Sequence, residues 1–248
     1  MGSAEPMDYA AQYAKFHPED PAHRHGLRRL HWRMLGPLLP VAKDAPILDV
    51  GCGRGYALED IAALGYTHLA GIDPDAGQVA FARGLGLTVE QPEDTIAFLR
   101  ARPGTYAAIL LMDVLEHIPR ERQADFLQVI ALALHPGGRV VLTVPNAASA
   151  IASFWYHNDT THQASFTGDG LAFLLEQSGL TRVAVTGVEF FPRPRFLFWC
   201  PTPRTLAWWL RCGLRLRQRG TFVAELGWRR GRTVVLTPNL LATAERPA

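Results

Sequence analysis

Cysteine, lysine and long apolar runs are all scarce in this chain of 248 residues. The three cysteines, Cys52, Cys200 and Cys212, are odd in number and lack C-x-x-C spacing, which argues against a disulfide framework or a zinc ribbon. We therefore expect a reducing, cytoplasmic setting. The apolar stretches stop well short of the roughly twenty residues that a membrane-spanning helix requires, so no segment is expected to cross a bilayer.

Charge is unevenly distributed, although the formal net charge is only +2. Residues 49–125 carry twelve acidic residues and six arginines, whereas residues 190–232 carry ten arginines and one acidic residue, Glu225. This asymmetry predicts that the late segment faces an anionic partner or forms a solvated basic face.

Apolar segments alternate with helical patterns between residues 46 and 146. Strands are predicted at "PILDV", "THLAGID", "LTVEQ", "YAAILLMDV" and "GRVVLTVP", with helices between them. Pro136–Gly138 is expected to form a turn between the last of these helices and the strand "GRVVLTVP". Strands spaced by helices form a doubly wound α/β sheet, covered on both faces.

The remaining segments are expected to belong to the same single domain. Residues 7–40 predict N-terminal helices, and residues 147–191 predict a loop, a helix and a strand. Residues 192–232 form a basic insertion, and residues 233–248 predict two short strands or one bent strand.

Three glycines follow the first predicted strand, in the sequence "DVGCGRG". Gly51, Gly53 and Gly55 allow a tight turn and a close approach of a ligand to the backbone. Roughly twenty residues later, Asp73 ends the second strand, where a carboxylate can accept hydrogen bonds from ribose hydroxyls. NAD and S-adenosylmethionine both fit this pattern, but the spacing G-x-G-x-G, rather than G-x-G-x-x-G, argues against NAD.

Four segments, "LDVGCGRGY", "GIDPD", "LLMDVLEHIP" and "ALHPGGRVVLTVPN", resemble in order and spacing the motifs of class I S-adenosylmethionine-dependent methyltransferases. The resemblance covers residues 46–146, and "DVLEHIP" is similar to the motif of members that methylate small molecules and sugars on oxygen. It implies a mostly parallel, seven-stranded Rossmann-like sheet with an N-terminal helical cover and a C-terminal helical insertion. By position, it implies that the cofactor is bound by Asp49, Gly51, Cys52, Gly53, Gly55, Asp73, Met112 and Asp113.

Two details qualify the resemblance. The chain reads "VEQPED" where the family often has a Gly-Asp pair beside the adenine ring, so the adenine contacts stay unassigned. Glu116 and His117 are expected to cap or pack the following helix turn.

The stretch "WYHNDTTHQASF" places His157, Asp159 and His162 just after the fifth predicted strand. Ligands bind beyond the carboxyl ends of parallel strands, so this stretch is expected on the acceptor side of the cofactor. A hydroxyl acceptor must lose its proton, and a histidine suits that role. Because "TTHQASF" and the helix after it resemble small-molecule members of the family, His162 is the predicted base, with His157 and Asp159 as its helpers.

Two alternatives for this stretch stay open. The pattern H-x-D-x-x-H can present three ligands to a divalent metal, although no further carboxylate can be assigned to such a site. The polar residues can also form an ordinary turn, with Thr167 capping the next helix. We expect no metal.

The segment "TPRTLAWWLRCGLRLRQRG", residues 202–220, predicts a basic amphipathic helix over residues 203–219. One stripe carries Leu206, Trp209, Leu210 and Gly213, and another carries Arg204, Arg211, Arg215 and Arg219. Packing of this helix on its own domain, or on a second copy in a homodimer, is one interpretation. Peripheral docking at the inner face of a membrane is the other, and suits a lipid-linked acceptor. Nucleic-acid binding is disfavoured, because no aromatic stacking module accompanies the charge.

Together these patterns predict an S-adenosylmethionine-dependent enzyme that methylates a hydroxyl of a small molecule or saccharide. An NAD-dependent oxidoreductase and a non-catalytic, cofactor-binding scaffold subunit are the alternatives.

Overall fold

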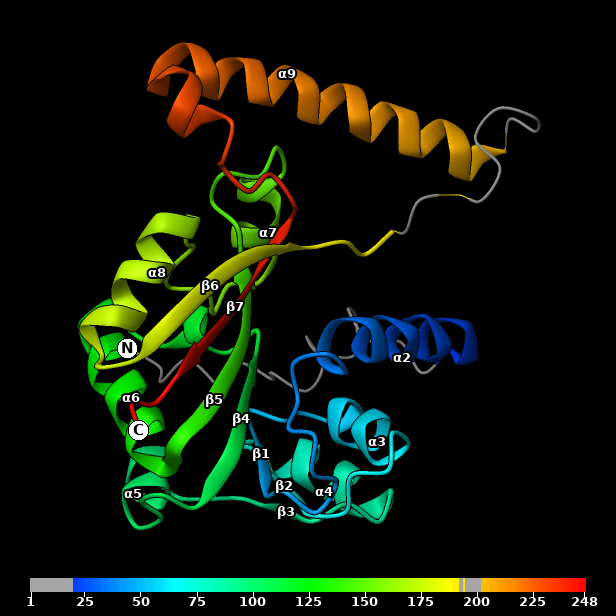
Figure 1. Cartoon of the computed structure of the whole chain (residues 1–248). Helices are drawn as coiled ribbons and strands as arrows, with labels where there is room; N and C mark the ends of the chain where they lie inside the picture. Colours follow the sequence, from blue (N-terminus) through cyan, green and yellow to red (C-terminus); the bar gives the residue numbers. More distant parts are fainter. Residues whose placement is uncertain (1–19, 192–193, 195–201) are drawn as a thin grey trace, which may run out of the picture.

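Seven strands form one sheet in the order β3-β2-β1-β4-β5-β7-β6 in the computed structural model, which describes residues 20–191, 194 and 202–248. The strands are β1 (Ile47–Val50), β2 (Leu69–Ile72), β3 (Val89–Glu90), β4 (Tyr106–Met112), β5 (Leu134–Pro145), β6 (Thr181–Val188) and β7 (Asn239–Glu245). β7 runs antiparallel to both β5 and β6, and the other neighbouring strands are parallel. The predicted doubly wound, mostly parallel sheet is confirmed (Figure 1).

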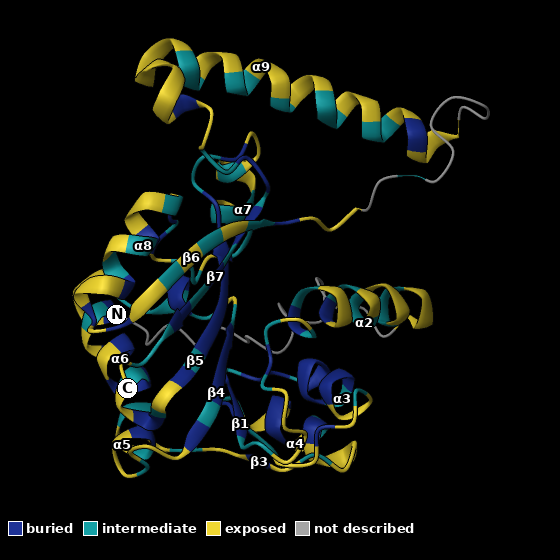
Figure 2. Cartoon of the chain, viewed as in Figure 1, coloured by how far each residue is buried: buried dark blue, intermediate teal, exposed yellow. Residues whose placement is uncertain are grey.

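Helices cover both faces of this sheet. The helices of the described residues are α2 (Pro21–Leu35), α3 (Tyr56–Ala62), α4 (Ala76–Gly84), α5 (Thr95–Arg100), the 3-10 helix η1 (Leu115–His117), α6 (Arg120–Ala133), α7 (Ala152–Asn158), α8 (Gly168–Gln177) and α9 (Pro203–Gly231). Alternate residues of β4 face opposite sides: Ile109 and Leu111 pack with α6 and α8, whereas Ala108 and Leu110 pack with α2 and α3. The central strands are therefore buried on both faces, as Figure 2 shows.

The structure differs from the sequence prediction at two element boundaries, and it selects one of the two arrangements predicted for the C-terminus. α6 ends at Ala133 and β5 begins at once, so Pro136–Gly138 lies inside the strand and not before it. Leu134 is buried and already pairs with Tyr106, and the Pro-Gly-Gly segment is absorbed as an irregularity of the strand. The C-terminus forms one strand, β7. A short helix, α7, covers the start of the predicted acceptor-side loop.

Some predictions lie outside the described residues. These are the helical pattern over residues 7–19 and the part of the basic insertion that includes Cys200.

α2 is held onto α3 by a buried ionic cluster. Asp60 in α3 is fully buried and accepts hydrogen bonds from Arg24 at 2.9 Å and from Arg28 at 2.8 Å, and its carboxylate lies 2.7 Å from Nδ1 of His31. Burial alone would raise the pKa of Asp60, but these three partners outweigh it and lower the pKa to about 2. The cluster fixes the N-terminal helix over the carboxyl end of the sheet.

This cluster predicts an acid-sensitive contribution to stability. The pKa of Asp60 is lowered from 3.8 to about 2, so its stabilising effect is complete above about pH 4 and is lost as the pH falls towards 2. The loss should be about 2 kcal/mol in the free energy of unfolding. Urea unfolding of the wild type and of Asp60→Asn at pH 5 and pH 3 measures about half of this loss, about 1 kcal/mol, because pH 3 lies between the two pKa values. An equal pH dependence in the two proteins would contradict the assignment.

α9 extends the predicted helix of residues 203–219 as far as Gly231, with a break at Gly227, where φ is 77°. It lies in the connection between β6 and β7 and stands away from the sheet and its covering helices (Figure 1). Among the described residues, no helix combines the length and apolar character that crossing a bilayer demands.

Candidate functional site

The loop after β1 holds three glycines in the left-handed backbone region. The φ angles are 72° at Gly51, 51° at Gly53 and 76° at Gly55. A Cβ at Gly51 would lie 2.6 Å from Cγ2 of Val114, and one at Gly55 would clash with Leu87. Glycine is therefore required for both the conformation and the packing of this loop.

Asp73 follows β2 and braces the glycine loop. Its Oδ2 accepts a hydrogen bond from the backbone N–H of Gly53 at 2.8 Å, and its Oδ1 accepts one from the N–H of Asp75 at 2.9 Å. Burial raises the pKa of Asp73, although both hydrogen bonds act to lower it. The carboxylate is thus pinned at the turn, with its position fixed relative to the loop.

Asp49, in β1, and Cys52, within the glycine loop, are also buried. Burial, followed by repulsion from Asp73, raises the pKa of Asp49 to about 8. Its Oδ1 has no hydrogen-bond partner among the described residues. Burial also raises the pKa of the Cys52 thiol, which disfavours the thiolate form. An unpartnered buried carboxyl oxygen beside a glycine loop is a site for a polar ligand group.

Asp113 directly follows β4. Its backbone is strained, since its φ is 55°. Its carboxylate accepts hydrogen bonds from the Thr143 hydroxyl and from the Asn239 amide, both at 3.0 Å. The concave surroundings desolvate Asp113 and raise its pKa, against the opposing effect of the Thr143 hydrogen bond. Strands β4, β5 and β7 thus meet at one side chain at the edge of the site.

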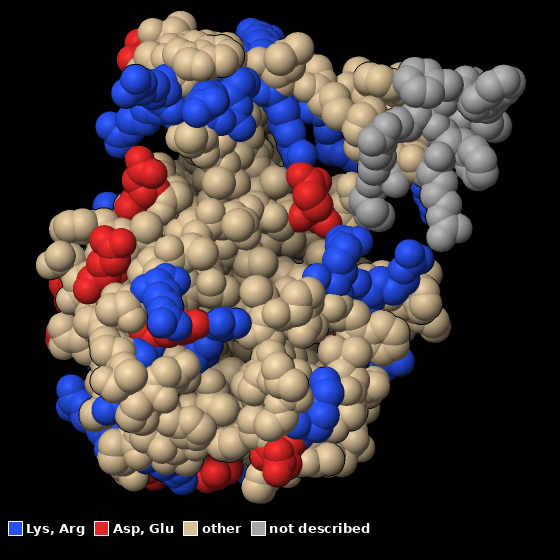
Figure 3. All heavy atoms as spheres, in the orientation of Figure 1, with Lys and Arg blue, Asp and Glu red and all other residues tan. Residues whose placement is uncertain are grey.

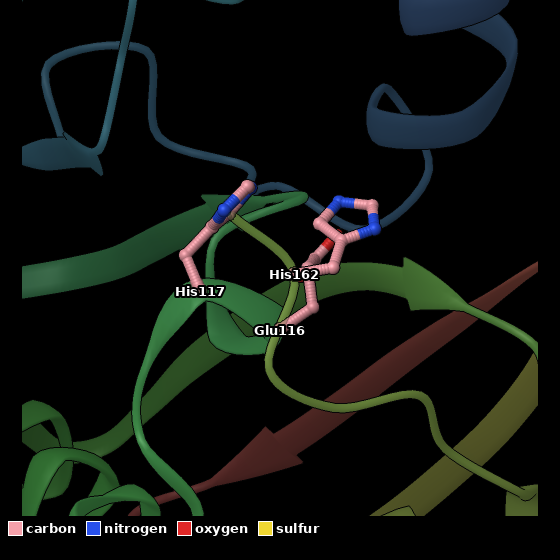
Figure 4. A group of neighbouring side chains, drawn as sticks. All are labelled: Glu116, His117 and His162. Carbon is pink, nitrogen blue, oxygen red and sulfur yellow. The ribbon is translucent and has the colours of Figure 1, made fainter. Parts of the chain in front are cut away.

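Glu116, His117 and His162 form a second cluster of polar side chains in the site. One ligand-type atom of each lies within 4.8 Å of the others, and Figure 4 shows the three side chains converging. Glu116 is fully buried, and neither of its carboxyl oxygens has a partner among the described residues. Burial, reinforced by repulsion from Asp113, raises the pKa of Glu116 well above its ordinary value.

A hydrogen-bonded chain orients His117. The Thr161 hydroxyl donates to Oδ1 of Asp159 at 2.6 Å, so its oxygen is free to accept a second hydrogen bond. Nδ1 of His117 lies 2.8 Å from this oxygen and is therefore the protonated nitrogen, which donates to Thr161. Burial, and then the neighbouring His162, lower the pKa of His117. The rings of His117 and His162 lie 4.8 Å apart, and Nδ1 of His162 is buried without a partner among the described residues.

A cavity of about 1300 Å³ is lined both by the glycine loop and by the cluster of Glu116, His117 and His162. Its walls include the glycine loop, Asp73, Asp113, the cluster around Glu116 and one side of α2. Trp155, Phe190 and Phe191 add aromatic surface. A cavity of this volume exceeds the roughly 300–1,000 Å³ that a single small-molecule ligand occupies, so it has room for two ligands.

A family model described as a methyltransferase domain matches residues 20–185, which is more than half of the chain. The chain belongs to this methyltransferase family. Over 201 residues, 75% of this chain and 82% of the relative, it is 27% identical to the ubiquinone biosynthesis O-methyltransferase of Burkholderia pseudomallei (strain 1710b). The enzyme of the same name from Paraburkholderia xenovorans (strain LB400) is 38% identical over 105 residues, 40% of this chain and 44% of that protein. This second match spans less than half of the relative's length.

A solved structure shares the fold of this methyltransferase. The SAM-dependent methyltransferase from Archaeoglobus fulgidus superposes with a TM-score of 0.67 at 18% identity, covering 96% of this chain and all of that one. Membership of the family argues against the NAD-dependent alternative.

Most of the predicted site residues line the cavity of this methyltransferase. Its lining includes Asp49, Gly51, Cys52, Gly53, Asp73, Met112, Asp113, Asp159 and His162. Gly55 lies outside the lining and begins α3. His157 also lies outside it, because α7 carries this residue to the surface, where its ring packs against Tyr156. The three residues of the pattern H-x-D-x-x-H are therefore not brought together.

Two residues of the acceptor-side cluster were not predicted as site residues. Glu116 and His117 were expected to cap or pack a helix turn, but neither η1 nor α6 has a side-chain cap. His117 instead bonds to Thr161, and the backbone oxygen of Glu116 accepts from the N–H groups of Gln163 and Ala164. Their place directly after β4 was the available signal, because the carboxyl ends of parallel strands border the ligand site.

Proposed function

We propose that this methyltransferase transfers the methyl group of S-adenosylmethionine to a hydroxyl of a small molecule or saccharide, with His162 as general base. The observation that carries the proposal is the position of His162, which lies beside His117 and lines the same cavity as the glycine loop. A base is needed on the acceptor side, because a hydroxyl is a poor nucleophile until its proton is removed.

The donor half of the site is assigned to the residues around the glycine loop. Gly51 and Gly53 leave room for the methionine end of the cofactor, Gly55 shapes the same turn where α3 begins, and Asp73 and Asp49 supply carboxyl groups for its polar groups. Cys52, Met112 and Asp113 complete this wall. S-Adenosylmethionine supplies an activated methyl group, so the contribution of the protein is alignment of the two reactants and exclusion of water.

The acceptor half is assigned to the histidine cluster. The acceptor oxygen attacks the methyl carbon, the carbon–sulfur bond breaks, and the proton of the hydroxyl passes to His162. Asp159 supports this step: burial acts to raise its pKa, but the hydrogen bonds from Thr161 outweigh burial and lower it, so it stays an anion near both imidazoles. A nearby carboxylate stabilises the imidazolium that forms. His157 is proposed only as an outer helper of substrate binding, because it is exposed.

Methyl transfer to oxygen can be tested with deuterated-methyl S-adenosylmethionine and pools of phenols, saccharides and lipid-linked saccharides. The expected result is labelled methyl on an oxygen atom of one acceptor class, detected by mass spectrometry. Labelled methyl on nitrogen or carbon would contradict the proposal. Binding of the cofactor without turnover of any acceptor would favour the scaffold alternative.

A divalent cation offers a second mechanism for the same step, because two imidazoles and a carboxylate are a common donor set for such ions. A metal would lower the pKa of a bound hydroxyl directly. With His162 as base, we expect the rate of methyl transfer to be unchanged by EDTA. A loss of activity in EDTA that returns on addition of Mg²⁺, Mn²⁺ or Zn²⁺ would show that a metal ion, and not His162 alone, activates the acceptor hydroxyl.

A further inference from the structure

The long helix α9 turns its charged side towards the rest of the molecule. Arg215 forms an ion pair with Glu189, which follows β6, and Arg219 donates hydrogen bonds to the backbone oxygens of Gly231, at the end of α9 itself, and of Val234, in the chain leading to β7, at 2.8 and 2.6 Å. Figure 3 shows several Lys and Arg side chains in the space between α9 and the body of the molecule. The contacts that hold this helix are therefore polar.

The apolar stripe of α9 points in the opposite direction. The exposed fraction is 61% for Leu206, 66% for Leu210 and 75% for Leu216, and Trp209 and Leu214 are nearly half exposed. A helix that packs on its own domain buries its apolar stripe and exposes its charges. The prediction that this helix packs on its own domain through that stripe is therefore wrong. A continuous stripe of this kind marks an interaction surface.

The charge on α9 selects the partner. The helix contains seven arginines and one glutamate, Glu225. Arg217 is exposed within the apolar stripe, where a long side chain can reach phosphate groups while its methylenes stay on apolar surface. Trp209 and Trp228 suit the boundary between headgroups and acyl chains. These features fit an anionic lipid surface.

A second copy of the chain is a poorer partner for the same stripe. Two copies packed through it would bury Arg217 of each chain, and Glu225 is the one carboxylate that the helix offers for neutralising arginines. Burying charges without a paired carboxylate is costly. At a membrane, the same arginines stay at the headgroups.

We propose that α9 docks this methyltransferase on an anionic lipid bilayer, with Leu206, Trp209, Leu210 and Leu214 entering the headgroup–acyl boundary. α9 contacts the segment between β5 and α7, since Gln218 donates to the backbone oxygen of Ala148, and Phe154 of α7 is also exposed. Arg211 stacks on Phe191, which lines the cavity. Resting on the proposed function, this arrangement would let a lipid-linked hydroxyl acceptor pass from the membrane into the cavity.

Vesicle binding by the full-length protein tests the docking. The expected result is co-sedimentation with phosphatidylcholine vesicles that contain phosphatidylglycerol, little binding to pure phosphatidylcholine, and weaker binding at high salt. The double variant Leu206→Gln, Leu210→Gln keeps good helix formers and should weaken binding by about tenfold or more, because it removes two apolar anchors. Phe173→Gln on α8, where the exposed fraction is 62%, is the matched control and should bind like the wild type.

Three outcomes would overturn the docking. These are no binding of the wild type to anionic vesicles, equal binding by the double variant, and a dimer in light scattering that the double variant converts to monomer while vesicle binding is unchanged. Methyl transfer to a water-soluble acceptor separates this proposal from the catalytic one. The double variant should retain that activity, whereas failure of the catalytic proposal would appear as its absence from the wild type.

Discussion

Replacing Gly53 by valine should abolish binding of S-adenosylmethionine, as measured by titration calorimetry. Gly53 has a φ of 51°, a region that a β-branched residue avoids. It also lines the cavity, and its N–H is held by Asp73, so an added side chain would both strain the turn and occupy the cavity wall. Retention of micromolar affinity would show that the loop does not hold the cofactor.

A matched control separates this effect from general instability. Gly86 also has a left-handed backbone, with a φ of 80°, but a Cβ there would meet no atom within 4 Å, and the residue lies outside the cavity lining. Gly86→Val should therefore lower stability by a comparable backbone strain while leaving cofactor affinity close to that of the wild type. Equal losses of affinity in the two variants would point to unfolding.

Replacing His162 by alanine should lower kcat by about a hundredfold or more, the usual effect of losing a general base, and should leave the Kd for S-adenosylmethionine nearly unchanged. The imidazole lines the cavity but belongs to a different segment from the glycine loop, which is why the two measurements are expected to separate. Single-turnover kinetics with saturating cofactor measure the chemical step directly.

His157→Ala provides the comparison for this variant. It removes the same side chain from the same segment, but His157 is exposed and does not line the cavity, so its effect on kcat should be severalfold at most. An unchanged rate in His162→Ala would remove His162 from the chemistry. A loss in His157→Ala as large as that in His162→Ala would mean that the conformation of the loop, and not a base, limits the reaction.

Local patterns were sufficient to predict the fold. A run such as "YAAILLMDV" is apolar throughout because β4 is buried on both faces, and alternation of such runs with helices leaves few arrangements besides an open parallel sheet. The prediction was wrong at Pro136–Gly138, where pairing with β4 draws the segment into β5 against its local preference for a turn. Tertiary pairing outweighs local propensity at such boundaries.

The donor side of the site was more predictable than the acceptor side. Gly51, Gly53 and Asp73 follow their strands directly, so the sheet alone determines that they meet. The acceptor side depends on how the segment after β5 returns over η1. That path brings His162 to His117 and Glu116 and carries His157 to the surface, whereas the sequence pattern placed His157 in the site and assigned Glu116 and His117 to a helix turn.

The sequence by itself determined the doubly wound sheet, the glycine turn with its acidic partner, and the amphipathic character of residues 203–219, because each depends on neighbours along the chain. The tertiary structure alone decided which histidines share the cavity and which side of α9 faces outward. Both outcomes depend on contacts between distant segments, such as His117 with Thr161 and Arg215 with Glu189. Periodicity gives a helix two faces, but only its packing partners decide which face remains in contact with solvent.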